Sequence, residues 1–121
     1  MPDLPGAMVG LDTGTGKLLW RHDVEPWGGV AFALDEEGAW NWKHLKSLLP
    51  HCEPTHWSGA LTDAQGRVYL GRSTGDLYAY DPKTDTEQKF RTHDSILMGG
   101  LSSAPGMLVV STCSLVYVFK F

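Results

Sequence analysis

Residues 59–84, GALTDAQGRVYLGRSTGDLYAYDPKT, decide the fold, because they form the one complete structural unit in the sequence. Residues 67–71 and 76–80 are short runs rich in Val, Tyr and Leu. The residues between them, 73–75, are Ser, Thr and Gly, which favour a tight turn. This pattern predicts a β-hairpin.

The same unit recurs about 40 residues later. Gly59, Leu61, Ala64, Gly66 and Val68 align with Gly99, Leu101, Ala104, Gly106 and Leu108, and after one deleted residue Tyr78 aligns with Tyr117. A repeat of this length with several short strands in each unit is typical of β-propeller blades. The sequence therefore predicts an all-β fold, a partial β-propeller built of four-stranded antiparallel blades, with three units at most in 121 residues.

A second hairpin is predicted near the N-terminus, from residues 7–12 and 17–22. In the turn between them, Asp12 can accept hydrogen bonds from backbone amides and Gly16 can take a positive φ. Residues 81–85 carry the same turn chemistry, with Asp85 in the place of Gly16. Aspartate tolerates the left-handed region better than most residues, so the two turns are expected to match.

Both hairpins contain a motif that resembles a known repeat. LDTGTGKLLW, residues 11–20, and YLGRSTGDLYAYDPKT, residues 69–84, are similar to the repeat of the pyrroloquinoline-quinone-like β-propellers. That family includes quinoprotein dehydrogenases and non-catalytic members such as the outer-membrane assembly lipoprotein of the BamB type. The resemblance implies that Trp20 docks between neighbouring blades and that Phe90 replaces it in the next unit. The positions that carry the repeat are Asp12, Gly16, Trp20, Gly66, Gly75, Asp81, Phe90 and Gly106.

The repeat divides the chain into four segments. We expect a partial blade at 7–24, an incomplete blade at 25–57, a complete blade at 58–93 and a partial blade at 94–121, after an irregular lead-in at 1–6. In the incomplete blade, residues 42–49 have helical spacing and precede Pro50, which predicts a short helix or loop in place of the outer strands. In the last blade, strands are expected at 97–104, 107–112 and 115–119.

Both faces of the central hairpin are expected to be buried, because blades pack on both sides. We group Val68, Leu70, Leu77 and Ala79 on one face and their alternating neighbours Tyr69, Tyr78 and Tyr80 on the other. Ala60 and Gly71 are expected where neighbouring blades crowd.

Composition excludes several classes of partner. The net charge is −4, with 42% hydrophobic and 20% charged residues, which is ordinary for a globular protein with a buried core. The ten Lys and Arg residues are scattered along the chain, so no nucleic-acid surface is predicted. No apolar run approaches the about 20 residues that cross a bilayer, and no export signal is visible. We expect a soluble protein, with its compartment unassigned.

The resemblance does not extend to a cofactor site. In quinoprotein dehydrogenases the quinone lies between a tryptophan and a disulfide of two adjacent cysteines, beside a calcium ion. Cys52 and Cys113, the only cysteines, are far apart in the sequence, and no acidic cluster matches the calcium ligands. We expect two reduced cysteines with Cys113 facing a core, no cofactor and no enzymatic activity.

Other candidates for chemistry are weak. His51, Cys52 and His56 are weak zinc-ligand candidates, because imidazole and thiolate bind zinc but no second spaced pair completes a tetrahedral set. Ser58 and Ser73 lie near glycines but not in a G-x-S-x-G turn, so no catalytic residue is assigned. A further group, Trp27, Trp40, Trp42 and Trp57, can either stack on a sugar-like ligand or pack between blades, and we favour packing.

Two segments are expected to contact other protein chains. The first contains Trp40, Trp42, Leu45 and Leu49, and the second contains Val116, Tyr117, Val118 and Phe119 beside an unpaired strand edge. Because closed propellers use about four to eight blades, we expect a homo-oligomer or a subunit of a larger assembly, with 17–22 serving as the fourth strand for 115–119 of a second copy or partner.

The function predicted from the sequence is therefore a non-catalytic protein-interaction or scaffold module. Two alternatives stay open: a fragment or subunit of a quinoprotein-type dehydrogenase, and a small-molecule binding module that uses the tryptophan group.

Overall fold

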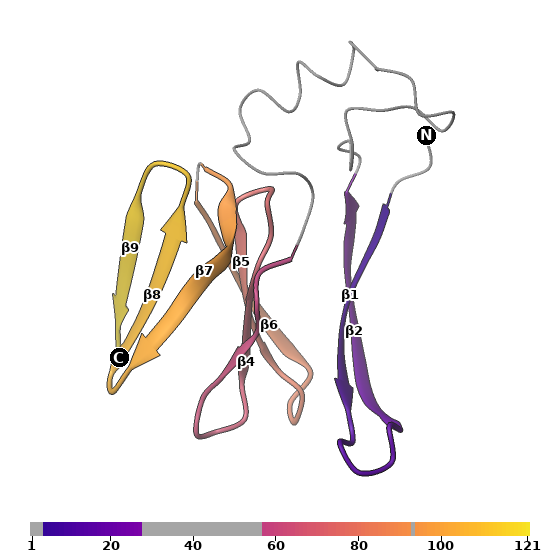
Figure 1. The fold of residues 1–121 in the computed structure, drawn as a ribbon. Helices are drawn as coiled ribbons and strands as arrows, with labels where there is room; N and C mark the ends of the chain where they lie inside the picture. Colours follow the sequence, from indigo (N-terminus) through magenta and orange to yellow (C-terminus); the bar gives the residue numbers. More distant parts are fainter. Residues whose placement is uncertain (1–3, 28–56, 93) are drawn as a thin grey trace.

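The computed structural model describes residues 4–27, 57–92 and 94–121 (Figure 1). Within these ranges the chain forms nine β-strands and no helix, which confirms the all-β prediction. The strands build three antiparallel sheets, in the orders β1-β2, β3-β4-β5-β6 and β7-β8-β9. The expected short helix at 42–49 lies outside the described residues.

Each sheet is built from strands that are consecutive in the sequence. Their bounds are β1 Leu4–Leu11, β2 Leu18–Trp27, β3 Leu61–Thr62, β4 Val68–Gly71, β5 Asp76–Asp81, β6 Thr86–Arg91, β7 Ile96–Ala104, β8 Met107–Thr112 and β9 Val116–Lys120.

The first hairpin is held by the turn that its sequence predicts. Asp12 Oδ1 accepts hydrogen bonds from the backbone amides of Gly14 at 3.0 Å and Thr15 at 2.7 Å, and Gly16 has a φ of 71°. The corresponding turn of the central sheet repeats these features: Asp81 Oδ1 accepts from the amide of Lys83 at 2.9 Å, and Asp85 has a φ of 52°. Asp85 therefore takes the left-handed conformation of Gly16, as predicted.

Two expectations about the first hairpin are wrong. The lead-in is not irregular throughout, because β1 begins at Leu4, and a boundary at residue 24 falls inside β2. Leu4 pairs with Trp27, and a register shift separates Leu4 from Gly6. Proline is tolerated in an edge strand at such an irregularity, which explains why Pro5 does not end the strand.

The internal repeat is visible in the strand register. In β4–β5, Val68 pairs with Tyr80, Tyr69 with Ala79, Leu70 with Tyr78 and Gly71 with Leu77. In β8–β9, Leu108 pairs with Phe119, Val109 with Val118, Val110 with Tyr117 and Ser111 with Val116. These pairs coincide when the first strand is moved by 40 positions and the second by 39. The sequence alignment, with its single deletion, thus describes a structural repeat.

Two apolar clusters cover opposite faces of the central sheet. Tyr69 and Leu77 pack with Ile96, Leu108 and Val110 of the third sheet, with Ala79 partly buried beside them. On the other face, Tyr78 and Tyr80 pack with Met8 and Val24 of the first hairpin, with Leu70 partly buried there. Both faces are buried, as predicted.

The membership of the two faces differs from the expected grouping. Tyr69 lies opposite Ala79, and Leu70 lies opposite Tyr78. Residues paired across strands share a face, so Tyr69 belongs with Leu77 and Ala79, and Leu70 belongs with the two tyrosines. Side-chain alternation shows which residues of one strand share a face. The number of residues in the turn sets the register, and the register decides which face of the next strand lies on the same side of the sheet.

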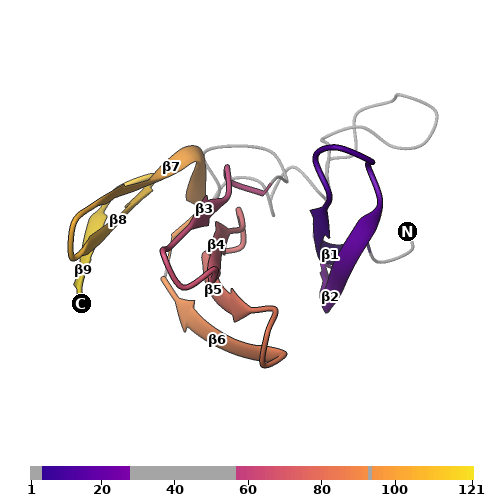
Figure 2. The same ribbon diagram turned by 90° about the horizontal axis from the view of Figure 1, so that it is seen from below.

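The three sheets stand side by side in an open stack, in chain order (Figures 1 and 2). The first hairpin contacts the central sheet directly through the cluster of Met8, Val24, Tyr78 and Tyr80. Most of the blade expected at 25–57 lies outside the described residues.

Cys113 is disulfide-bonded, which corrects the expectation of reduced cysteines. The one other cysteine of the chain, Cys52, lies outside the described residues.

Candidate protein-interaction surface

Each sheet presents two faces along the stack. We define the forward face of each sheet by two of its residues: Met8 and Trp20 in the hairpin, Leu77 and Phe90 in the central sheet, and Val116 and Val118 in the third sheet. The opposite face is the rear face, and it contains Val9 and Leu11 in the hairpin, Tyr78 and Tyr80 in the central sheet, and Tyr117 and Phe119 in the third sheet. The strand pairings and the two repeats of the sequence define these faces.

The forward face of the hairpin covers the rear face of the central sheet. Met8 is 2% exposed and packs with Tyr78 and Tyr80. The Trp20 ring lies 5.3 Å from the Tyr80 ring, tilted by 51°. Trp20 therefore contributes to the contact between the hairpin and the central sheet.

The forward face of the central sheet covers the rear face of the third sheet in the same way. The Phe90 ring contacts Tyr117 at 5.8 Å and Phe119 at 5.1 Å, both edge to face. Phe119 is the repeat equivalent of Tyr80, so Phe90–Phe119 corresponds to Trp20–Tyr80. A Cβ on Gly71 would lie 2.5 Å from Ile96 Cγ2, which confirms the expected crowding at Gly71, whereas Ala60 is exposed.

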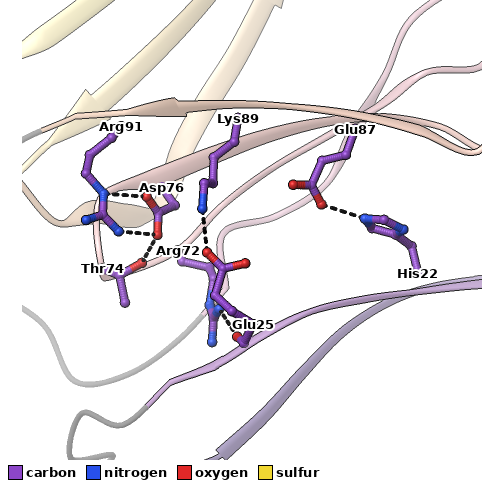
Figure 3. Close-up of polar contacts among 8 residues, drawn as sticks. All are labelled: His22, Glu25, Arg72, Thr74, Asp76, Glu87, Lys89 and Arg91. Atoms are coloured by element: carbon purple, nitrogen blue, oxygen red, sulfur yellow. Dashed lines mark hydrogen bonds and ion pairs between the residues drawn. The ribbon is translucent and has the colours of Figure 1, made fainter.

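A row of charged side chains also joins the hairpin to the central sheet (Figure 3). His22 Nε2 lies 2.5 Å from Glu87 Oε2, and Lys89 Nζ donates to Glu25 Oε1 at 2.5 Å. The hydrogen bond from Lys89 lowers the pKa of Glu25, and the Glu25 carboxylate in turn raises the pKa of Lys89. Figure 3 shows the side chains of Glu87 and Lys89 extending from β6 toward β2. Both therefore form contacts within the chain.

Further along the row, Asp76 is 3% exposed at its side chain and accepts hydrogen bonds from Arg91 Nε at 2.8 Å and Arg91 Nη2 at 3.0 Å. Buried Arg72 donates to the backbone oxygen of Glu25 at 2.9 Å, and its guanidinium lies 4.8 Å from the centre of the Trp57 ring. These cations are therefore neutralised or hydrogen-bonded within the fold, and they do not form a basic surface.

Trp57 belongs to this inter-sheet packing. Its ring lies 5.6 Å from that of Tyr78, and its backbone forms a bridge with Arg72. Of the four tryptophans expected to form one group, Trp57 is the one whose side chain the structure describes, and it packs between sheets. Trp40 and Trp42 lie outside the described residues, as do Leu45 and Leu49.

No described residue packs over the forward face of the third sheet. Val116 is 64% exposed and Val118 is 52% exposed. Their repeat equivalents in the central sheet, Leu77 and Ala79, are respectively buried at 5% exposure and partly buried against the third sheet. This uncovered face, which we call the terminal face, also includes Val109 of β8, opposite Val118, and Met107, opposite Lys120.

Strand β9 adds a free backbone edge to this surface. It pairs only with β8 among the described strands, whereas its repeat equivalent β5 pairs with both β4 and β6. The Leu115 carbonyl accepts from Thr112 and the Phe121 amide donates to Gly106, so odd-numbered backbone groups point toward β8. By the alternation of an antiparallel ladder, the backbone groups of Val116, Val118 and Lys120 point to the free edge.

The expected interaction residues of β9 therefore divide into two pairs. Val116 and Val118 lie on the terminal face, whereas Tyr117 and Phe119 are partly buried against the central sheet. Tyr117 and Phe119 thus pack within the chain, and Val116 and Val118 are the two of the four that are exposed. Sequence reasoning missed this division because it treated the strand as an isolated edge.

Asp94 fixes the turn that carries β9. Its Oδ2 accepts hydrogen bonds from Thr112 Oγ1 at 3.0 Å, the Ser114 amide at 2.6 Å and Ser114 Oγ at 2.6 Å, and its Oδ1 accepts from the Ser95 amide at 2.9 Å. Burial raises the pKa of Asp94, but these hydrogen bonds outweigh it, and the pKa lies below the ordinary value. The β8–β9 turn is thus anchored to the start of β7.

A groove of about 340 Å³ lies between the β3–β4 and β7–β8 turns, and its lining includes Tyr69, Phe121 and Arg67. Its polar groups satisfy one another: Asp63 Oδ2 accepts from Arg67 Nε at 2.7 Å and from the Tyr69 hydroxyl at 3.0 Å. Burial raises the pKa of Asp63, but Arg67 and the other donors outweigh it and the pKa is lowered. The groove offers aromatic contacts rather than a set of reactive groups.

The candidate serines are hydrogen-bonded within the fold. Ser58 is buried, donates to the Gly59 carbonyl at 3.0 Å and accepts from the Gly71 amide at 2.8 Å. Ser73 is 1% exposed. Neither is presented to solvent as a nucleophile.

The metal candidates are not placed by the structure, because His51, Cys52 and His56 lie outside the described residues. Among residues 4–27, 57–92 and 94–121, no group of three or more His, Cys, Asp or Glu side chains could hold a metal ion. In the same part of the chain, no helix is long and apolar enough to span a membrane.

No protein-family model, curated protein or solved structure matches this chain.

Proposed function

We propose that this chain is a non-catalytic interaction module that works as a subunit of a larger assembly and docks another protein chain on its terminal face and β9 edge. One observation carries the proposal. The terminal face repeats a face that is covered inside the same chain, yet Val116 is 64% exposed where its equivalent Leu77 is 5% exposed.

The terminal face and the β9 edge offer a partner both apolar area and unpaired backbone groups. Apolar surface is stabilised by about 25 cal/mol for each Å² removed from water, and a free strand edge offers backbone donors and acceptors to a second strand. The repeat supports a propeller-like architecture, since the hairpin and the central sheet each dock their forward face on the rear face of the next sheet. The charged residues do not offer a competing function, because the Lys89, Arg72 and Arg91 side chains are engaged within the chain.

Site-specific photocrosslinking in the cells that produce the protein tests this function. A photoreactive phenylalanine analogue at position 118 should crosslink to another polypeptide at a defined mass, and the same analogue at Thr13, in the first turn, should not. Val118 is half-exposed and Thr13 is exposed, so both replacements should leave the fold intact. Equal crosslinking from both positions, or none from position 118, would contradict the proposal.

A further inference from the structure

The three sheets pack in the same orientation, because at both interfaces in the chain a forward face covers a rear face. The forward face of the hairpin, with Met8 and Trp20, covers the rear face of the central sheet. The forward face of the central sheet, with Leu77 and Phe90, covers the rear face of the third sheet. In both interfaces an aromatic residue from the last strand of the covering sheet contacts equivalent positions of the covered sheet. Trp20 contacts Tyr80, and Phe90 contacts Phe119.

Two faces are left over, one at each end of the stack. The first is the terminal face, which is a forward face. The second is the rear face of the hairpin, where Val9 is 49% exposed and Leu11 is 55% exposed. Val9 pairs with Arg21, and a register shift separates Gly10 from Leu11. One chain thus presents a free forward face and a free rear face, the two kinds of face that dock on each other within it.

We propose that the partner of the terminal face is the hairpin rear face of a second copy of this chain, so that copies associate head to tail. This inference rests on the proposed function and names its partner. Within one chain, forward faces meet rear faces in both interfaces, which favours a head-to-tail contact over two terminal faces meeting across a two-fold axis. A head-to-tail contact uses two different patches, and it closes into a ring or extends as a filament according to the rotation between copies.

The charges at the two ends are compatible with this contact. On the hairpin rear face, Arg21 Nε lies 2.8 Å from Asp23 Oδ1, so the two side chains neutralise each other. The terminal face carries one cation of β9, Lys120, at its margin. The centre of each face is aliphatic, with Val9 and Leu11 on one and Val116 and Val118 on the other. Burying a charge at either centre without a partner is therefore strongly unfavourable.

Complementation of two variants tests the proposal. Val118→Glu disables the terminal face and Leu11→Glu disables the hairpin rear face, while each variant keeps the other face. We expect light scattering to show that the unaltered protein self-associates at micromolar concentration. Each variant alone should associate more weakly, with a dissociation constant raised at least about 30-fold. An equimolar mixture should form a species of twice the monomer mass, because one intact forward face meets one intact rear face and the complex cannot extend.

Thr13→Glu serves as the matched control, since Thr13 is exposed in the first turn and belongs to neither face. Both test positions are about half-exposed, and circular dichroism and the unfolding midpoint verify that each variant is folded. If either fails to fold, Val116→Lys and Val9→Lys replace them at the neighbouring exposed positions of the same faces.

The outcomes separate this inference from the proposed function. A folded, unaltered protein that stays monomeric overturns the head-to-tail contact, and so does a Leu11→Glu variant that assembles normally or a mixture that stays monomeric. If crosslinking from position 118 still captures a different polypeptide, the interaction function stands without self-association. If neither crosslinks nor assembly are found, both proposals fail.

Discussion

The Trp20 ring packs on the Tyr80 ring, with 5.3 Å between their centroids, and this contact attaches the first hairpin to the central sheet. A Cβ at Gly10 would overlap the Trp20 ring at Nε1, so the indole lies directly against the backbone of β1. The indole can take this position only because residue 10 has no side chain.

Replacing Trp20 with Ala should therefore weaken the attachment of the hairpin. Because Trp20 is only partly buried, we expect a loss of about 2 to 3 kcal/mol, below the values for fully buried aromatic residues. The measurement is urea unfolding followed by circular dichroism. Phe90→Ala is the matched control at the second interface, and since Phe90 is 43% exposed its effect should be smaller. Unchanged stability of Trp20→Ala would show that the hairpin is held by other contacts.

Leu77 and Val116 allow one substitution to be compared at two equivalent positions. Leu77→Asp places a charge in the interface between the central and third sheets, so we expect loss of folded protein. Val116→Asp places the same charge on the terminal face, where the residue is 64% exposed, and should leave the monomer folded. Thermal unfolding of both variants is the readout. A Leu77→Asp variant that melts like the unaltered protein would refute the assigned interface.

Gly71 tests the close approach of the central and third sheets. In Gly71→Ala, the added methyl group would lie 2.5 Å from Ile96 Cγ2 and 3.0 Å from Ile96 Cδ1. Ile96 is fully buried, so the sheets must separate or Ile96 must repack, at a cost of about 1 to 3 kcal/mol. Gly59→Ala is the control, because nothing lies within 4 Å of its added Cβ. Equal unfolding midpoints for the two variants would count against the close packing.

Local sequence signals predicted the strands well because they depend on neighbours in the chain. The turn at Asp81–Asp85 was matched to that at Asp12–Gly16, and the positive φ of Asp85 agrees with this match. The 40-residue alignment with one deletion reproduced the register of β8–β9. Turn residues and alternating apolar runs carry this information within a few positions.

Contacts between distant segments were not predictable in the same way. The direct docking of Met8 and Val24 on Tyr78 and Tyr80 depends on which sheets meet, and alternation alone does not specify this. The division of β9 into partly buried Tyr117 and Phe119 and exposed Val116 and Val118 likewise follows from the neighbouring sheet. The disulfide of Cys113 was missed because two isolated cysteines give no spacing pattern.

Asp94 gives a pH-dependent prediction for the turn that carries β9. The pKa of Asp94 is lower in the folded chain than its ordinary value, because hydrogen bonds from Ser114 and Thr112 outweigh the effect of burial. The unfolded chain therefore binds the proton more tightly, and the stability from Asp94 is present above the ordinary aspartate pKa, about 3.9, and is lost as the pH falls through the folded pKa. Asp94→Asn should destabilise the protein by about 1 to 3 kcal/mol at neutral pH, because the amide nitrogen cannot accept the hydrogen bonds made to Oδ2.

The measurement is urea unfolding of the unaltered and Asp94→Asn proteins at pH 7 and at successively lower pH. The difference in unfolding free energy should be largest at neutral pH, should begin to shrink as the pH falls below the ordinary aspartate pKa and should be smallest below the folded pKa, where a protonated Asp94 resembles the amide. Asp23→Asn is the control, because Asp23 is 68% exposed at its side chain and its ion pair with Arg21 lies on the surface. Exposed ion pairs contribute about 0 to 1 kcal/mol, so this variant should stay close to the unaltered protein. A constant difference for Asp94→Asn across the whole range would mean that the carboxylate charge is not what anchors the β8–β9 turn.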